Sequence, residues 1–467
     1  MDLGKLGSYY IVGSEDALQG NEIITRTYWR QPYSSTALLA TFKKIFQLHP
    51  QLKSTWSNET LEWQPLEDSK FEILLEKEAS KILKPISEEE LLTQFEPSSS
   101  SLPFRIRVFK PDQQPDEVIF LINHAFANGL SSVHWISRWF EMYANYSGLS
   151  VGVSASAGRE PHLGALSKRY QNPSGRYSTS RTLLKKLRGI LWAVIYLIRF
   201  TIRVRKHPTT IDLSRGQIPK LEGKYATRSF LLDTDTTQRL IEFAKNSDQS
   251  LGELICIELI GALFQTQSNR DRICFSIPAD LRNTLTQIPL DAPGNYTSSL
   301  IAQTFRTENT RLSVQQTFRW LRRNTPYGIV QIFSWLAANP QKLLEHFKQQ
   351  TRKPLPQRAP FEDFTFALSN LGVIQDPVME ELLSRISMYT KTQTLFVGAF
   401  TFSGRLSIDI CLSTDLFSED ECSLTLKRAI QALTSYKAPE TSTAPKIIKP
   451  SAVTSSLPTT YLNPPSD

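Results

Sequence analysis

The strongest constraint on this chain is the stretch at residues 119–129, where an apolar run delivers a histidine to a turn. The run Ile-Phe-Leu-Ile at 119–122 is typical of a buried strand, and an Asn-Gly pair at 128–129 closes the turn. Apolar groups at helical spacing follow. A histidine held at a strand end can face a cleft, and its reference pKa of about 6.5 suits a general base. The alternative for His124 is a core histidine satisfied by backbone groups.

Composition indicates a globular protein long enough for two domains: 467 residues, 40% hydrophobic and 21% charged. The N-terminus lacks a basic segment followed by a short apolar core, so we expect no signal peptide and a cytoplasmic location. The four cysteines form no CxxC pair and the six histidines are scattered. We therefore expect reduced thiols, no metal site and no permanently bound cofactor.

The net charge of +8 is concentrated in one segment. Between residues 161 and 211 the chain carries eleven Lys and Arg and no Asp or Glu, so the remainder is slightly acidic. A local excess of this kind argues against a nucleic-acid-binding protein and predicts one surface that meets an anionic partner.

Residues 183–206 of this segment predict an amphipathic helix, although the alternation at 198–205 also permits a strand. Its unbroken apolar part, 189–198, is too short to span a bilayer. A basic face with aromatic residues beside a wide apolar face is what an interfacial helix needs. The alternatives are a helix packed on the protein with solvated arginines, and a surface for an acyl-carrier or other acidic protein. The stripe that carries this expectation comprises Lys185, Arg188, Trp192, Tyr196, Arg199, Arg203 and Lys206.

Each half of the chain mixes strands and helices, which predicts an α/β (α+β) protein with a mixed sheet in each half. We assign residues 1–160 to an N-terminal lobe, 161–217 to a basic linker, 218–437 to a C-terminal lobe and 438–467 to a disordered tail. In the first half we expect strands at 9–12, 22–29, 71–76, 104–109 and 118–122, a hairpin at 52–64, and helices at 34–49, 87–95 and 130–145. In the second half we expect strands at 227–232, 272–278, 297–304, 364–368, 387–389, 395–402 and 405–413, and helices at 236–246, 250–267, 313–322, 340–352 and 418–435.

Several short motifs, taken in order, resemble the chloramphenicol-acetyltransferase-like acyltransferase superfamily. This group includes peptide-synthetase condensation domains, alcohol acetyltransferases, polyketide-associated acyltransferases and the BAHD plant enzymes. Its HHxxxDG signature is matched by the sequence NHAFANG at 123–129. Further matches are LHPQLK at 48–53, FRIR at 104–107, DLR at 280–282, GNY at 294–296, SNLG at 369–372 and FSGRL at 402–406.

The resemblance implies a two-lobed fold with a tunnel between the lobes, entered by donor and acceptor from opposite faces. His124 matches the catalytic second histidine, which would take the acceptor's proton. Gly129 would let the chain turn beside it. Ser369, Asn370 and Asn295 are candidates for oxyanion donors or tunnel residues; for Ser369 and Asn370 the alternative is that they shape a bulge or turn.

The chain departs from the signature at two positions. Asn123 replaces the first histidine, which the superfamily uses structurally. Asn128 replaces the aspartate that pairs with the arginine of the DLR-like motif, here Arg282. A neutral amide can still hydrogen-bond Arg282, but without the charge-assisted part of the interaction.

The resulting hypothesis is a monomeric O-acyltransferase that uses acyl-CoA or an acyl-carrier protein as co-substrate and a lipophilic alcohol or glycolipid as acceptor. It would be cytoplasmic, with membrane association through the basic segment 181–206. One alternative is an amide-forming condensation enzyme of a peptide-synthetase pathway. Another is a binding protein that has the fold without the chemistry.

Overall fold

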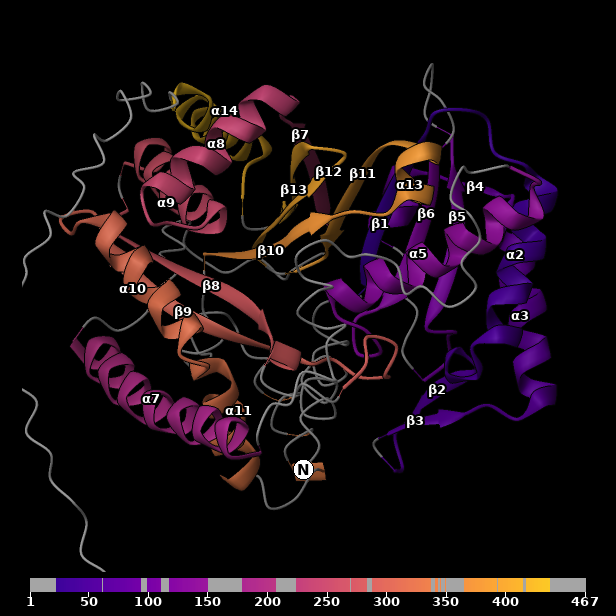
Figure 1. Cartoon of the computed structure of the whole chain (residues 1–467), viewed down its shortest axis with the longest axis horizontal. Coiled ribbons are helices and arrows are strands. Elements are labelled where there is room, and N and C mark those ends of the chain that lie inside the picture. Colours follow the sequence, from indigo (N-terminus) through magenta and orange to yellow (C-terminus); the bar gives the residue numbers. More distant parts are fainter. Residues whose placement is uncertain are drawn as a thin grey trace, which may run out of the picture.

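The computed structural model describes residues 22–60, 62–93, 99–110, 117–149, 179–206, 224–268, 270–283, 288–336, 341–342, 345, 349, 365–392, 394–414 and 417–436. Within them the chain forms two mixed sheets and a small two-stranded sheet, with helices packed on both large sheets (Figure 1). The predicted α/β class with mixed sheets is confirmed. The strand predicted at 9–12 and the tail at 438–467 lie outside the described residues.

The first sheet has the strand order β11-β1-β6-β5-β4. Its strands are β1 (Glu22–Trp29), β4 (Pro85–Ile86), β5 (Phe104–Phe109), β6 (Glu117–Asn123) and β11 (Leu383–Thr390). All pairs are antiparallel except β4 with β5. Helices α2 (Ser35–Leu48), α3 (Asp68–Ile82), α4 (Glu88–Thr93), α5 (Gly129–Tyr146) and α13 (Pro377–Leu382) belong to this half, together with the hairpin of β2 (Ser54–Ser57) and β3 (Glu62–Pro65).

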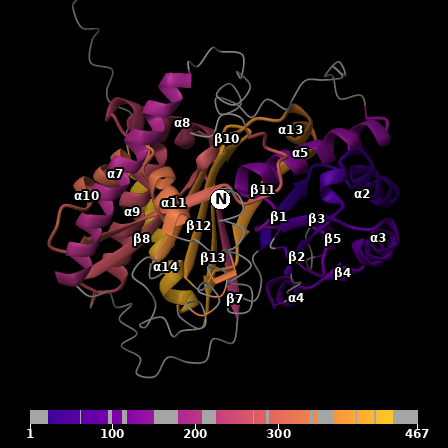
Figure 2. The ribbon, with the colours of Figure 1, turned by 90° about the horizontal axis from the view of Figure 1, so that it is seen from below.

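The second sheet has the order β7-β13-β12-β10-β8-β9. Its strands are β7 (Tyr225–Leu231), β8 (Arg272–Asp280), β9 (Thr297–Phe305), β10 (Phe366–Ile374), β12 (Leu395–Phe402) and β13 (Arg405–Ser413). Helices α8 (Thr234–Asn246), α9 (Leu251–Thr266) and α14 (Glu419–Ser435) gather on one side, and α7 (Thr179–Lys206), α10 (Thr310–Arg322) and α11 (Thr325–Leu336) lie near β9 (Figures 1 and 2). The β12–β13 turn uses Ser403 and Gly404 of the FSGRL motif, both with positive φ, which is typical of a two-residue hairpin.

The sheets do not follow the division of the sequence into halves. Strand β11 comes from the second half but pairs with β1 along seven registered residues. Its neighbours in the chain, β10 and β12, belong to the second sheet. The Met388 amide of β11 donates to Asp409 Oδ2 of β13 at 2.8 Å, so this strand joins the two sheets directly.

One expected element is wrong and another is shorter than the observed one. Residues 71–76 form part of helix α3, because Phe71, Leu75, Ala79 and Ile82 recur at helical spacing and are buried together. The strand expected at 364–368 continues to Ile374, so the SNLG motif lies within β10 instead of after it. The strand alternative at 198–205 is also excluded, since α7 extends to Lys206.

Two absences apply to the described part of the chain. None of its helices combines the length and the apolar character needed to cross a membrane. Nor do these residues place three or more His, Cys, Asp or Glu side chains where they could hold a metal ion.

Candidate active site at the junction of the two lobes

The histidine turn begins where the buried strand β6 ends. The side-chain Oδ1 of Asn123 accepts a hydrogen bond from the Ala125 amide at 2.9 Å. The backbone carbonyl of Asn123 accepts from the amides of Phe126 and Ala127 at 3.0 Å each. This is the local side-chain-to-backbone bonding that favours Asn in turns. Asn123 therefore shapes the turn that presents His124.

His124 is half-buried, and its Nδ1 lies 3.1 Å from the carbonyl oxygen of Ala127. Burial lowers the pKa of His124, while the backbone hydrogen bonds of His124 and Ala127 oppose that shift. The imidazole is therefore neutral at pH 7, and a carbonyl partner requires Nδ1 to carry the proton. Among the described residues Nε2 has no hydrogen-bond partner, so its lone pair is available to accept a proton.

Asn128 ties the turn to helix α5 and to the second lobe. It is the N-cap of α5, where its Oδ1 accepts from the Ser131 amide at 3.1 Å. Its Nδ2 donates to Oδ2 of Asp280, at the end of β8, at 3.0 Å. We predicted a bond from Asn128 to Arg282; the structure instead places Asp280 between them.

Asp280 also organises Arg282. Its Oδ1 accepts from the Arg282 amide at 2.7 Å, and its Oδ2 lies 3.3 Å from Arg282 Nη1. The Arg282 side chain is fully buried, with its guanidinium 4.4 Å from the centre of the Tyr296 ring. One carboxylate thus joins the histidine turn to the DLR motif.

Three further contacts bring the second lobe onto the turn. The Gly294 amide donates to the Phe126 carbonyl at 2.7 Å, and Asn295 Nδ2 lies 3.5 Å from His124 Nδ1. A Cβ built on Gly129 would come within 2.8 Å of Leu371 Cδ2 on β10. Gly129 therefore lies against the Leu371 side chain where the two lobes touch, a contact that the motif alone did not give.

The SNLG motif shapes a bulge in β10. The register against β12 shifts between Asn370 and Gly372, and the Gly372 amide donates to Asn370 Oδ1 at 3.0 Å. Gly372 has a φ of 77°, which favours glycine. Asn370 is exposed and its Nδ2 lies against Gly252 of α9. The alternative of a bulge thus fits Asn370 better than a donor beside His124.

The predicted site residues consequently fall into two groups. His124, Asn128, Gly129, Arg282 and Asn295 meet at the lobe junction through the contacts above, and half-buried Ser369 lies on β10 two residues before Leu371. The basic residues of the α7 stripe lie elsewhere, since α7 packs beside α10 and β9 (Figure 1); Arg199 lies over the Trp320 ring of α10, and Arg203 lies over the Phe305 ring of β9.

Sequence reasoning missed the roles of Asp280, Tyr296 and Leu371. Asp280 and Tyr296 lie within the DLR and GNY motifs, so the motifs marked their positions. Their partners could not be read from the motifs, because each contact joins residues from distant parts of the chain. The expected tunnel between the lobes stays a prediction.

Comparison with solved structures is consistent with the motif order. No protein-family model matches the chain, and no curated protein matches its sequence. The epimerization domain from the third module of tyrocidine synthetase B aligns with a TM-score of 0.53 at 13% identity, over 93% of this chain and 95% of that one. Polyketide synthase associated protein 5 from Mycobacterium tuberculosis gives 0.54 at 14% identity, over 91% and 98%.

The cyclization-docking bidomain of EpoB from Sorangium cellulosum gives a TM-score of 0.54 at 13% identity, over 94% of this chain and 86% of that one. At these identities the likeness concerns the fold alone. With a mixed sheet in each half and the histidine turn at their junction, the chain has the two-lobed condensation-domain fold of the chloramphenicol-acetyltransferase-like proteins.

Proposed function

We propose that this protein is an acyltransferase that moves an acyl group from a thioester to the hydroxyl of a lipophilic alcohol or glycolipid, with His124 as general base. The observation that carries the proposal is the state of His124: a neutral ring, anchored through Nδ1 to the Ala127 carbonyl, whose Nε2 has no hydrogen-bond partner in the part of the chain that the structure describes. A fixed tautomer and a neutral ring are what a general base needs.

The reaction would proceed by direct transfer. Nε2 takes the proton from the acceptor hydroxyl as its oxygen attacks the thioester carbonyl carbon. The tetrahedral intermediate then collapses, the carbon–sulfur bond breaks, and the imidazolium returns the proton to the leaving thiolate. The products are an ester and a free thiol, and no external oxidant or reductant is consumed.

The intermediate carries an oxyanion that needs a fixed donor, and removing one such donor typically costs about 2.7–4 kcal/mol of transition-state stabilisation. Asn295 is the candidate with a contact to the His124 ring, since its Nδ2 lies 3.5 Å from His124 Nδ1. Ser369 is a second candidate from β10. Asn370 is the weakest, since its Oδ1 accepts from Gly372 at the bulge and its Nδ2 lies against Gly252 of α9.

The donor is proposed to be acyl-CoA or an acyl-carrier protein, used as co-substrate and not as a resident cofactor. Purified protein is incubated with labelled acyl-CoA, or with the acylated carrier, and a panel of lipophilic alcohols, and ester is measured by mass spectrometry. His124→Ala is expected to lower the rate by about 10²–10⁴-fold. His49→Gln is the matched control, because it removes a half-buried histidine that has no bond to the turn. Ester formation unchanged in His124→Ala would rule out the proposed base.

The second candidate function is amide-forming condensation, which the likeness to peptide-synthetase domains favours. It differs from the first in its acceptor and its donor. The same assay with aminoacyl-carrier acceptors would then yield an amide, and free acyl-CoA would not serve. A binding protein without activity would give no product with any donor, and His124→Ala would leave its ligand affinity unchanged.

A further inference from the structure

Helix α7 is held against the second lobe in a fixed rotation. Its inner face carries Ala193, Tyr196 and Phe200, all buried, and the Tyr196 hydroxyl donates to the Ile301 carbonyl at 2.6 Å. At Gly189 the helix approaches α11 so closely that a Cβ on Gly328 would lie 2.1 Å from the Gly189 carbonyl oxygen. The side of α7 that faces away from the protein is thus determined by packing.

That outer side is apolar, not basic. Its side chains are between 42% and 64% exposed and recur every three or four residues. At about 1.5 Å per residue the stripe is roughly 30 Å long. Of the alternatives for this segment, packing on the protein holds for the inner face of α7, and this packing leaves an apolar stripe exposed on the outer side. The stripe comprises Leu183, Leu184, Leu187, Leu191, Val194, Ile198 and Ile202.

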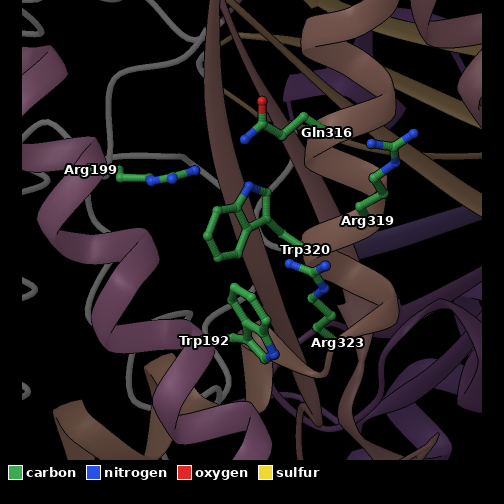
Figure 3. Close-up of a pocket in the computed structure, with 6 residues that line it drawn as sticks. All are labelled: Trp192, Arg199, Gln316, Arg319, Trp320 and Arg323. Carbon is green, nitrogen blue, oxygen red and sulfur yellow. The ribbon is translucent and has the colours of Figure 1, made fainter.

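Arg199 of α7 lines a cleft along the flank of this helix, together with Arg319 of α10 and Arg323 at the C-terminal cap of α10 (Figure 3). The cleft has a volume of about 310 Å³ and contains no carboxylate. Its lining comprises Trp192, Arg199, Gln316, Arg319, Trp320 and Arg323. Three guanidinium groups and two indoles form a surface suited to a phosphate group.

Nearby acidic residues do not neutralise this cleft. Glu308 pairs with Arg203 at 2.5 Å, and Glu253 pairs with Arg322 at 2.7 Å. Arg199 and Arg323 lie instead over the rings of Trp320 and Trp192. Among the described residues the three arginines of the cleft have no carboxylate partner, so they remain available to an anion.

We propose that α7 docks the protein on a bilayer that contains anionic phospholipids, with its outer leucine stripe among the acyl chains and a lipid phosphate in the arginine cleft. A long, straight, convex apolar face fits a fluid bilayer without needing a complementary groove, and the flanking positive charge is complementary to anionic headgroups. This proposal does not depend on acyl transfer and its test needs no catalysis.

The test is flotation of the full chain with vesicles of phosphatidylcholine alone or with 30% phosphatidylglycerol. The protein is expected to float with the anionic vesicles and not with the neutral ones, and less at high salt. Leu191→Glu with Ile198→Glu should lower partitioning at least about tenfold, because two exposed apolar groups are replaced by charges. Arg199→Glu with Arg319→Glu should lower it similarly.

Two matched controls make the same kinds of substitution outside α7 and the cleft. Leu312→Glu changes a leucine that is 62% exposed on α10, and Lys427→Glu reverses an exposed charge on α14. Both should float like the unchanged protein. If the α7 variants do not fold, a cysteine-reactive environment-sensitive dye on Leu191→Cys provides a second readout, and its emission should shift to the blue when anionic vesicles are added.

Each contrary result would overturn the proposal. The proposal fails if the protein does not float with anionic vesicles, if all variants float equally well, or if these vesicles leave the dye emission unchanged. Light scattering that shows a dimer disrupted by Leu191→Glu with Ile198→Glu, without flotation, would assign the stripe to a second copy of the chain. Binding of an acidic carrier protein through the cleft, without flotation, would assign it to that partner.

Discussion

Replacing Asn128 by aspartate would restore the superfamily signature, yet the structure predicts that it destabilises the protein. The Asn128 side chain is 2% exposed and donates to Asp280 Oδ2 at 3.0 Å. Aspartate keeps the N-cap of α5, since Asp and Asn cap equally well. It removes the donor, however, and sets two carboxylates against each other.

The loss of stability is set by the less costly of two ways in which the two carboxyl groups can coexist. Two charges 3 Å apart at an effective dielectric constant of 20 repel by about 5–6 kcal/mol. Taking up one shared proton at pH 7 avoids this repulsion at a cost of about 4 kcal/mol, given an aspartate reference pKa near 3.9. With one shared proton the pair carries the same net charge as in the unchanged protein, so the helix dipole adds no compensation. We expect a net loss of about 2–4 kcal/mol in the free energy of unfolding.

The loss should depend on pH with a definite sign. A carboxyl whose pKa is raised by folding is penalised above its unfolded pKa of about 3.9, and the penalty disappears as the pH falls toward that value. Urea unfolding of Asn128→Asp and the unchanged protein at pH 5, 6 and 7 should show a gap that narrows toward pH 5, by as much as about 1.4 kcal/mol per pH unit.

The double variant Asn128→Asp with Asp280→Asn is the matched control. It exchanges donor and acceptor, and it leaves one carboxylate beside Arg282. Most of the lost stability should therefore return. Asn128→Asp as stable as the unchanged protein at pH 7, with no rescue in the double variant, would refute the assignment of Asp280 as the partner of Asn128.

Three further predictions concern residues of the histidine turn and of helix α5, which follows it. Burial lowers the pKa of His134 to about 3, so unfolding takes up a proton between about pH 6 and 3. In urea unfolding, His134→Gln should therefore reduce the slope of the free energy of unfolding against pH in this range by about 1.4 kcal/mol per pH unit. An unchanged slope would contradict the burial of a neutral His134. Because burial lowers the pKa of His124, kcat/KM should stay constant below the ordinary histidine value near 6.5 before it falls with acid; a fall that begins above that value would contradict a buried base. Gly129→Ala places a Cβ against the flexible end of the half-buried Leu371 side chain, which can rotate away, so we expect a loss of at most about 1 kcal/mol in the free energy of unfolding, measured in urea. Adding Leu371→Ala should remove that loss; a loss that persists would place the strain elsewhere.

Strands and helices with clear periodicity could be predicted from the sequence almost to the residue. The bounds of β12 and β13 agree with the prediction, because alternating apolar residues and a Ser-Gly turn act together there. Residues 71–76 were misassigned because a short apolar window was read without its continuation to Ile82. The crossing of β11 to the first sheet depends on long-range pairing, for which the sequence carries no local signal.

The site was predicted in outline only. The histidine turn and the DLR and GNY motifs meet as the resemblance implied, but the bond from Asn128 goes to Asp280 because the amide needs an acceptor. The rotation of α7 about its axis could not be predicted from the sequence either, since its aromatic stripe or its leucine stripe could have faced the protein. The small residues Gly189 and Ala193 decide it by close contact with α11.

The central claim is that His124 acts as the base in acyl transfer, and the most direct measurement is the rate of product formation by the unchanged protein and by His124→Ala with the same thioester and acceptor. The account predicts ester in the first case and a loss of about 10²–10⁴-fold in the second, with equal thermal stability of the two proteins. Equal rates, or no product from the unchanged protein with any acyl-CoA or acyl-carrier donor, would contradict it.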